Sequence, residues 1–89
     1  MHILSVQSNV SYGYVGNRVA SFVFHRIGFH CTAIDTAQFS NHTGYPIFKG
    51  RRPEPEEIRD IYEAIVGNGM DDFDACIIGN LFLQFLIRC

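Results

Sequence analysis

The chain has 89 residues and a formal net charge of −2, and 47% of its residues are hydrophobic and 13% aromatic. This composition predicts a folded chain with a small core and argues against disorder. Its seven Lys and Arg residues form no basic stripe, so we expect no nucleic-acid partner.

Neither end of the sequence predicts a targeting or membrane segment. Residues 1–10 alternate in polarity and do not form a charged region followed by an apolar core, so we predict no secretion signal and expect a cytosolic protein. The apolar run over residues 81–87 is far shorter than the about 20 residues that cross a bilayer. No membrane partner is therefore expected.

The first part of the chain predicts a strand, a helix and a second strand. A short apolar run over residues 2–7 predicts a buried strand, and residues 8–14 predict a loop. Apolar residues at helical spacing then predict an amphipathic helix that begins near Gly16 and stops at Gly28. Residues 29–35 predict the second strand. The apolar positions of the helix are Val15, Val19, Phe22, Val23 and Ile27.

The second part predicts a long loop, a helix and a third strand. A polar loop is expected up to Gly50, followed by a proline-bearing connector over residues 51–55. Three glutamates among residues 54–57 suit the first turn of a helix because carboxylates there face its positive end. Gly67 ends this helix, and residues 74–79 predict the third strand.

This order of elements predicts parallel strands joined by right-handed crossovers. We therefore expect an α/β fold with a partial, open parallel sheet and flanking helices. After the third strand such a sheet predicts a polar loop. Residues 80–89 are instead strongly apolar, so we interpret them as a divergent hydrophobic tail. We expect the chain to be either a piece of a longer protein or a chain with an altered end.

A glycine-bearing segment follows the first predicted strand, at the edge where α/β sheets bind ligands. It begins near Ser8, and Gly13 and Gly16 would let the backbone approach a ligand closely. The spacing matches neither the dinucleotide motif GxGxxG nor a P-loop, so neither site is expected. The alternative is a turn that serves only to reverse the chain.

The segment over residues 36–45 predicts a second binding loop at the same edge of the sheet. It places hydroxyl and amide groups and the imidazole of His42 between the rings of Phe39 and Tyr45. Such a set suits a flat, polar heteroaromatic ligand, because rings can stack on its face while polar groups bind its edge. The alternative is a capped turn whose polar groups satisfy one another.

No metal ligand or catalytic residue is predicted in this chain. His2, His25 and His30 lack the spacing of a metal-binding motif, so we expect surface or core roles for them. The acidic cluster over residues 71–74 is interpreted as a solvated turn.

Three motifs together carry a resemblance to a known family. They are SVQS over residues 5–8, GYVGNR over residues 13–18 and QFSNHTGY over residues 38–45. The sequence from about Ile3 to Gly79 resembles the N-terminal third of pyridoxal kinase, a member of the ribokinase-like superfamily. The resemblance implies a truncated ribokinase-like, Rossmann-like three-layer fold, with residues 1–89 as the N-terminal part of a single domain.

The family transfers phosphate from ATP to the 5′-hydroxyl of pyridoxal, pyridoxine and pyridoxamine with a divalent cation, Mg or Zn, in pyridoxal 5′-phosphate salvage. By resemblance, Ser8 would bind the pyridine nitrogen side of the vitamin and Thr43 the polar substituents of its ring. The remaining implied substrate-binding residues are Val15, Phe39, His42, Gly16 and Tyr45. A homodimer is the family expectation.

The sequence departs from the family in two respects. Asn80 stands where the family usually has an aromatic residue, and residues 81–89 do not resemble the family. The ATP site, the cation-binding acidic residues and the catalytic aspartate of the family all lie further along its sequence. We therefore expect the isolated chain to be inactive. The alternative function is a catalytically inactive truncated fragment that binds the vitamin or another subunit.

Overall fold

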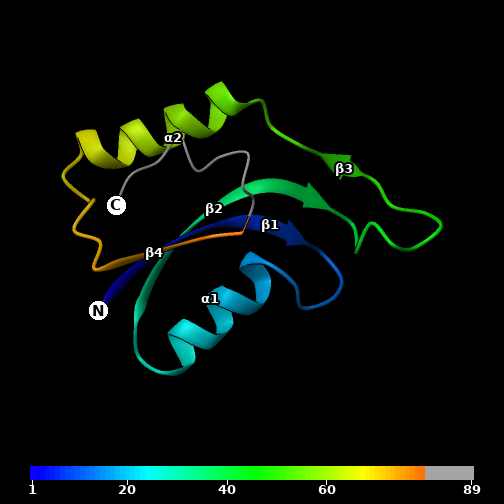
Figure 1. Ribbon diagram of the computed structural model, residues 1–89, viewed down its shortest axis with the longest axis horizontal. Coiled ribbons are helices and arrows are strands. Elements are labelled where there is room, and N and C mark those ends of the chain that lie inside the picture. The colour runs from blue at the N-terminus through cyan, green and yellow to red at the C-terminus, as the bar shows by residue number, and fades with distance from the viewer. Residues whose placement is uncertain (80–89) are drawn as a thin grey trace.

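The computed structural model describes residues 1–79, so the predicted tail over residues 80–89 lies outside the described residues (Figure 1). The predicted order of strands and helices is confirmed, and one short strand is added to it. The elements are β1 (His2–Val10), α1 (Asn17–Arg26), β2 (His30–Phe39), β3 (Gly50–Arg51), α2 (Pro55–Gly67) and β4 (Ala75–Ile78).

The strands form one open sheet in the order β3-β2-β1-β4. The long strand β1 lies between β2 and β4 and pairs with both in parallel. The two-residue strand β3 pairs antiparallel with the end of β2. The predicted open α/β sheet is confirmed, but the prediction of parallel strands alone is wrong at β3, which is too short to produce a sequence pattern.

Two predicted loops begin later than expected because β1 and β2 are longer than their apolar runs. Pairing between these strands continues after a register shift at Gln7 and Asn9, and it ends with Val10 opposite Phe39. The assignment of residues 8–10 and 36–39 to loops is therefore wrong. Polar side chains suggested a loop there, but backbone pairing decides the structure. Ser8 and Phe39 consequently stand on paired strands.

The two helices cover opposite faces of the sheet (Figure 1). Successive side chains of a strand point to opposite faces. Leu4 and Val6 pack with Ile34 and with Ile58 of α2, which together form the apolar core. On the other face, Ser5 meets Asn17 of α1 in a buried hydrogen bond.

The apolar stripe of α1 is exposed in the described part of the chain. Phe22 is 63% exposed and Ile27 58% exposed, whereas the one buried residue of the helix is the polar Asn17. The periodicity therefore predicted the helix correctly, but the one residue that α1 buries against the sheet is polar. Neither described helix has the length and apolar character needed to cross a membrane.

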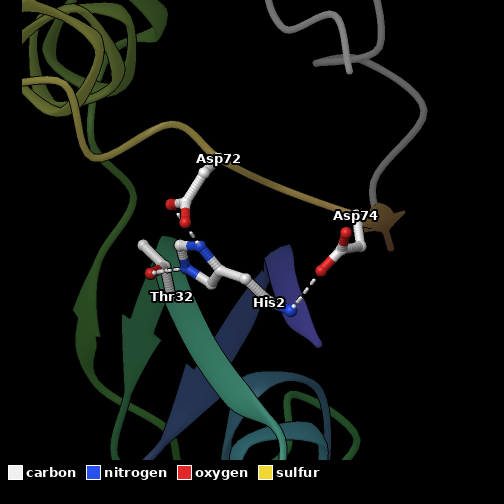
Figure 2. Close-up of polar contacts among 4 residues, drawn as sticks. All are labelled: His2, Thr32, Asp72 and Asp74. Carbon is white, nitrogen blue, oxygen red and sulfur yellow. Dashed lines mark hydrogen bonds and ion pairs between the residues drawn. The ribbon is translucent and has the colours of Figure 1, made fainter.

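The amino ends of the strands are joined by a polar cluster around His2 (Figure 2). The buried His2 ring places Nδ1 3.0 Å from Oδ1 of Asp72 and Nε2 2.7 Å from Oγ1 of Thr32. The backbone N–H of His2 donates to Oδ2 of Asp74 at 2.7 Å. The acidic segment is thus more than the solvated turn that we expected: Asp72 is exposed, yet it and Asp74 tie the segment before β4 to β1.

The hydrogen bond from His2 holds the pKa of Asp72 below its ordinary value. The ionised Asp72 carboxylate therefore stabilises the fold above about pH 4, and this contribution is lost as the pH falls through the lowered pKa. We expect Asp72→Asn to lower the free energy of unfolding slightly at pH 6 and progressively less toward pH 3. Urea unfolding at several pH values measures this, with Asp71→Asn as the control. A deficit that stays constant with pH would contradict the assignment.

Candidate functional site

A cavity of about 290 Å³ opens at the carboxyl ends of β1 and β2, and we call it the β1–β2 cavity. This is the edge at which ligands bind in open α/β sheets. The lining residues are Ser8, Val10, Val15, Phe39, Asn41, His42, Thr43 and Arg52. The cavity brings together residues from both predicted binding segments.

Five of the residues singled out from the sequence line the β1–β2 cavity. They are Ser8, Val15, Phe39, His42 and Thr43. They meet because parallel neighbouring strands end at the same edge of the sheet, so the segments that leave those strands face each other. The two hydroxyl groups thus lie in one cavity although their segments are far apart in the sequence.

The hydroxyl groups of Ser8 and Thr43 make no hydrogen bond with any other residue in the range 1–79. Ser40 and Asn41 of the second segment, by contrast, already have partners. Ser40 donates to Oδ1 of Asn41 at 2.7 Å, and the Asn41 amide donates to the carbonyl of Ile47 at 3.1 Å. A capped turn therefore describes Ser40 and Asn41 correctly, and it leaves Thr43 available to a ligand.

The imidazole of His42 is held in one tautomer when it is neutral. Its Nδ1 accepts a hydrogen bond from the backbone N–H of Gly44 at 2.9 Å. An accepting Nδ1 carries no proton, so the proton of the neutral ring is on Nε2. His42 can therefore donate from Nε2 to a ligand in the cavity.

Gly16 does not line the β1–β2 cavity, but it packs closely against the backbone carbonyl of Ser8. Its φ is 55°, a backbone conformation that residues with a side chain rarely adopt. A Cβ at this position would overlap the carbonyl oxygen of Ser8 and come within 3.1 Å of its hydroxyl oxygen. Gly16 thus determines how closely the start of α1 approaches β1.

Tyr45 does not line the β1–β2 cavity either. It contributes to a separate surface hollow of about 320 Å³ together with Tyr12 and Ile47. More than half of the Tyr45 side chain is exposed. The stacking role that the sequence suggested for Tyr45 has no counterpart in the geometry of the β1–β2 cavity.

Asn17 connects α1 to the strands that carry the site, a role that its position at the start of a predicted helix did not reveal. Its amide nitrogen lies 3.0 Å from the Gln7 carbonyl, 2.9 Å from the Ile34 carbonyl and 2.9 Å from Oδ1 of Asp35. Its Oδ1 accepts from the Ser5 hydroxyl at 2.7 Å. This one side chain connects α1 with both long strands immediately before the residues that line the cavity.

A larger hollow of about 440 Å³ lies between α1 and the sheet face that α1 covers. Its charged groups bond to neighbouring groups in the same hollow. Asp35 accepts from the amides of Asn9 and Asn17, and Arg18 donates to the Ser11 carbonyl at 2.5 Å. Because these groups already have partners, the β1–β2 cavity is the stronger candidate for a ligand site.

Comparison with known proteins gives the same family as the sequence motifs. No family model matches the chain. Human pyridoxal kinase is 43% identical over 77 residues, which cover 86% of this chain and 25% of that protein. The pyridoxal kinase PdxY of Deinococcus radiodurans is 46% identical over 69 residues, or 78% of this chain and 23% of that protein.

Solved structures agree in fold. Pyridoxal kinase from Leishmania donovani in complex with ADP and pyridoxamine matches with a TM-score of 0.85 and 42% identity, over 90% of this chain and 28% of that one. The chain is a ribokinase-like relative of the pyridoxal kinases. It spans about a quarter of the length of the curated relatives that it matches. Entamoeba histolytica pyridoxal kinase with PLP also matches, with a TM-score of 0.84 and 26% identity.

Proposed function

We propose that this chain forms the vitamin-binding part of a pyridoxal kinase, which phosphorylates the 5′-hydroxyl of pyridoxal, pyridoxine and pyridoxamine in pyridoxal 5′-phosphate salvage. One observation carries the proposal: the hydroxyl groups of Ser8 and Thr43, free of partners within residues 1–79, line one cavity beside the Phe39 ring. The L. donovani relative binds pyridoxamine and pyridoxine in complexes with ADP, which supports this ligand class.

The chemistry of the β1–β2 cavity suits a small pyridine ring. Its volume of about 290 Å³ is close to the lower end of the range for small-molecule sites, about 300–1,000 Å³. In our proposal Phe39 and Val15 contact the ring, Ser8 bonds to the ring nitrogen, and Thr43 bonds to a polar ring substituent. His42 would donate from Nε2 to an oxygen of the vitamin. Gly16 acts through Ser8, and Tyr45 remains a candidate only for contacts outside the cavity.

The ATP and divalent-cation sites belong to the proposal for the whole enzyme, not to residues of this chain. Within residues 1–79, no group of three or more His, Cys, Asp or Glu side chains could hold a metal ion. By resemblance the cation ligands lie further along the enzyme, and we assign no phosphoryl-transfer step to residues 1–79. The proposal also includes the cytosol as the compartment and a homodimer as the assembly, both supported only by resemblance.

Removing either free hydroxyl group is expected to weaken vitamin binding. We expect Ser8→Ala and Thr43→Ala each to cost about 1 kcal/mol or more, which is about a fivefold increase in Kd, because each variant loses one hydrogen bond in the cavity. Isothermal titration of the 89-residue chain with pyridoxal measures this. Ser21→Ala is the matched control, because Ser21 lies on α1 and outside the β1–β2 cavity.

Two results would contradict this account. Unchanged pyridoxal affinity in both Ser8→Ala and Thr43→Ala would reject the roles assigned to the two hydroxyl groups. Turnover of pyridoxal and ATP by the purified 89-residue chain would reject the assignment of phosphoryl transfer to parts of the enzyme outside this chain.

A further inference from the structure

Arg52 brings an uncompensated positive charge to the β1–β2 cavity. It is the only Lys, Arg, Asp or Glu that lines this cavity, as far as the described residues go. The adjacent Arg51 pairs with Glu57, with 2.7 Å between Nη2 and Oε2. Arg52 has no ion pair and no side-chain hydrogen bond with any residue from 1 to 79. Arg51 thus has an acidic partner, whereas Arg52 has none among the described residues.

The backbone holds Arg52 beside the cavity through β3. Gly50 pairs with Phe39 and Arg51 with Gln38, which directs the next residue back over the end of β2. Gly50 permits this approach, because a Cβ there would come within 2.7 Å of Cα of Phe39. The Arg52 guanidinium lies 5.8 Å from the centre of the Phe39 ring, within the range of a cation–π contact.

Arg52 and Ser8 also line a second, adjoining cavity of about 160 Å³. The other residues of this adjoining cavity are Gln7, Thr36, Ala37 and Gly79, and none of them carries a charge. The guanidinium group of Arg52 therefore borders both the β1–β2 cavity and the adjoining cavity. Substituents of a ligand ring that contacts Phe39 and Ser8 would lie close to it. A guanidinium group favours anionic oxygen and repels ammonium groups.

We propose that Arg52 makes the site discriminate among B6 vitamers by charge. This rests on the function proposed above. The vitamers share a ring hydroxyl group whose anionic form is stabilised by the protonated ring nitrogen, and Arg52 binds that oxygen. Pyridoxamine carries an ammonium group beside it, where pyridoxine carries a neutral hydroxymethyl group. Arg52 therefore favours pyridoxine over pyridoxamine.

Titration of the 89-residue chain with pyridoxine and with pyridoxamine tests this, because the two ligands differ only at that substituent. We expect the unaltered chain to prefer pyridoxine and Arg52→Gln to reduce the ratio of the two affinities by about fivefold, because the repulsion between two nearby positive charges is lost for pyridoxamine alone. The bond to the shared ring oxygen is lost for both vitamers and does not change the ratio. Arg52→Lys keeps the charge and should keep most of the preference. Arg51→Gln removes an equal charge outside the cavity and should leave the ratio unchanged.

The outcomes separate this inference from the function on which it rests. Vitamer binding with the same affinity ratio in the unaltered chain and in Arg52→Gln would overturn the role of Arg52 alone. An equal fall in the ratio in Arg51→Gln would also overturn it, because the effect would then come from net charge. Failure of the unaltered, folded chain to bind either vitamer would overturn both proposals. Far-ultraviolet circular dichroism of each variant verifies that it is folded.

Discussion

Gly16→Ala is expected to lower the free energy of unfolding by about 2 kcal/mol or more and to abolish vitamin binding. The new methyl group would overlap the Ser8 carbonyl oxygen, and φ at this position is 55°. Relief requires α1 to move away from β1, which would displace Ser8 and Val15 relative to each other. Stability and binding should therefore be lost together.

Urea unfolding and pyridoxal titration of Gly16→Ala measure these two effects. Gly67→Ala is the matched control, because a Cβ at Gly67 meets no atom within 4 Å and the residue ends α2. Alanine is the better helix former, so the control should be neutral or slightly more stable. An unaltered unfolding midpoint in Gly16→Ala would show that the start of α1 is not constrained against β1.

Asn17→Ala is expected to be the most destabilising polar substitution, at about 3 kcal/mol or more. The Asn17 side chain is 2% exposed and bonds to groups on β1 and β2. Its removal leaves the Ser5 hydroxyl and the Ile34 carbonyl buried without that partner. Each buried polar group left unsatisfied costs about 1–3 kcal/mol. Such a loss is a large part of the stability of a small chain.

Asn68→Ala provides the comparison for Asn17→Ala in urea unfolding. Asn68 also donates from its amide, to the Ala64 carbonyl at 2.9 Å, but it lies exposed at the end of α2. We expect a cost of about 1 kcal/mol or less for this exposed hydrogen bond. Equal losses in the two variants would mean that burial of the Asn17 network contributes no additional stability.

The helices and strands were predictable where a single physical signal dominates. Apolar spacing predicted α1, and α2 was predicted by glutamates near its start together with Gly67 at its end. The ends of β1 and β2 were not predictable, because polar residues such as Asn9 and Gln38 remain paired in the sheet. Strand pairing is a contact between distant segments, and local polarity does not report it.

Part of the site was predictable from the expected parallel order of the strands. Ser8 and Thr43 could be expected near each other because parallel strands end at one edge of a sheet. Arg52 could not, because it reaches the cavity only through the antiparallel pairing of β3 with β2. Tyr45 was grouped with Phe39 by sequence proximity, but the intervening turn directs it to another hollow.

The central claim is that one B6 vitamer contacts both segments at once. Nuclear Overhauser effects between bound pyridoxine and the isotope-labelled chain test it most directly. We predict contacts from the vitamin to the methyl groups of Val15 and Thr43 and to the Phe39 ring in the same complex. A bound vitamin with contacts to only one of these segments, or only to the hollow beside α1, would contradict the account.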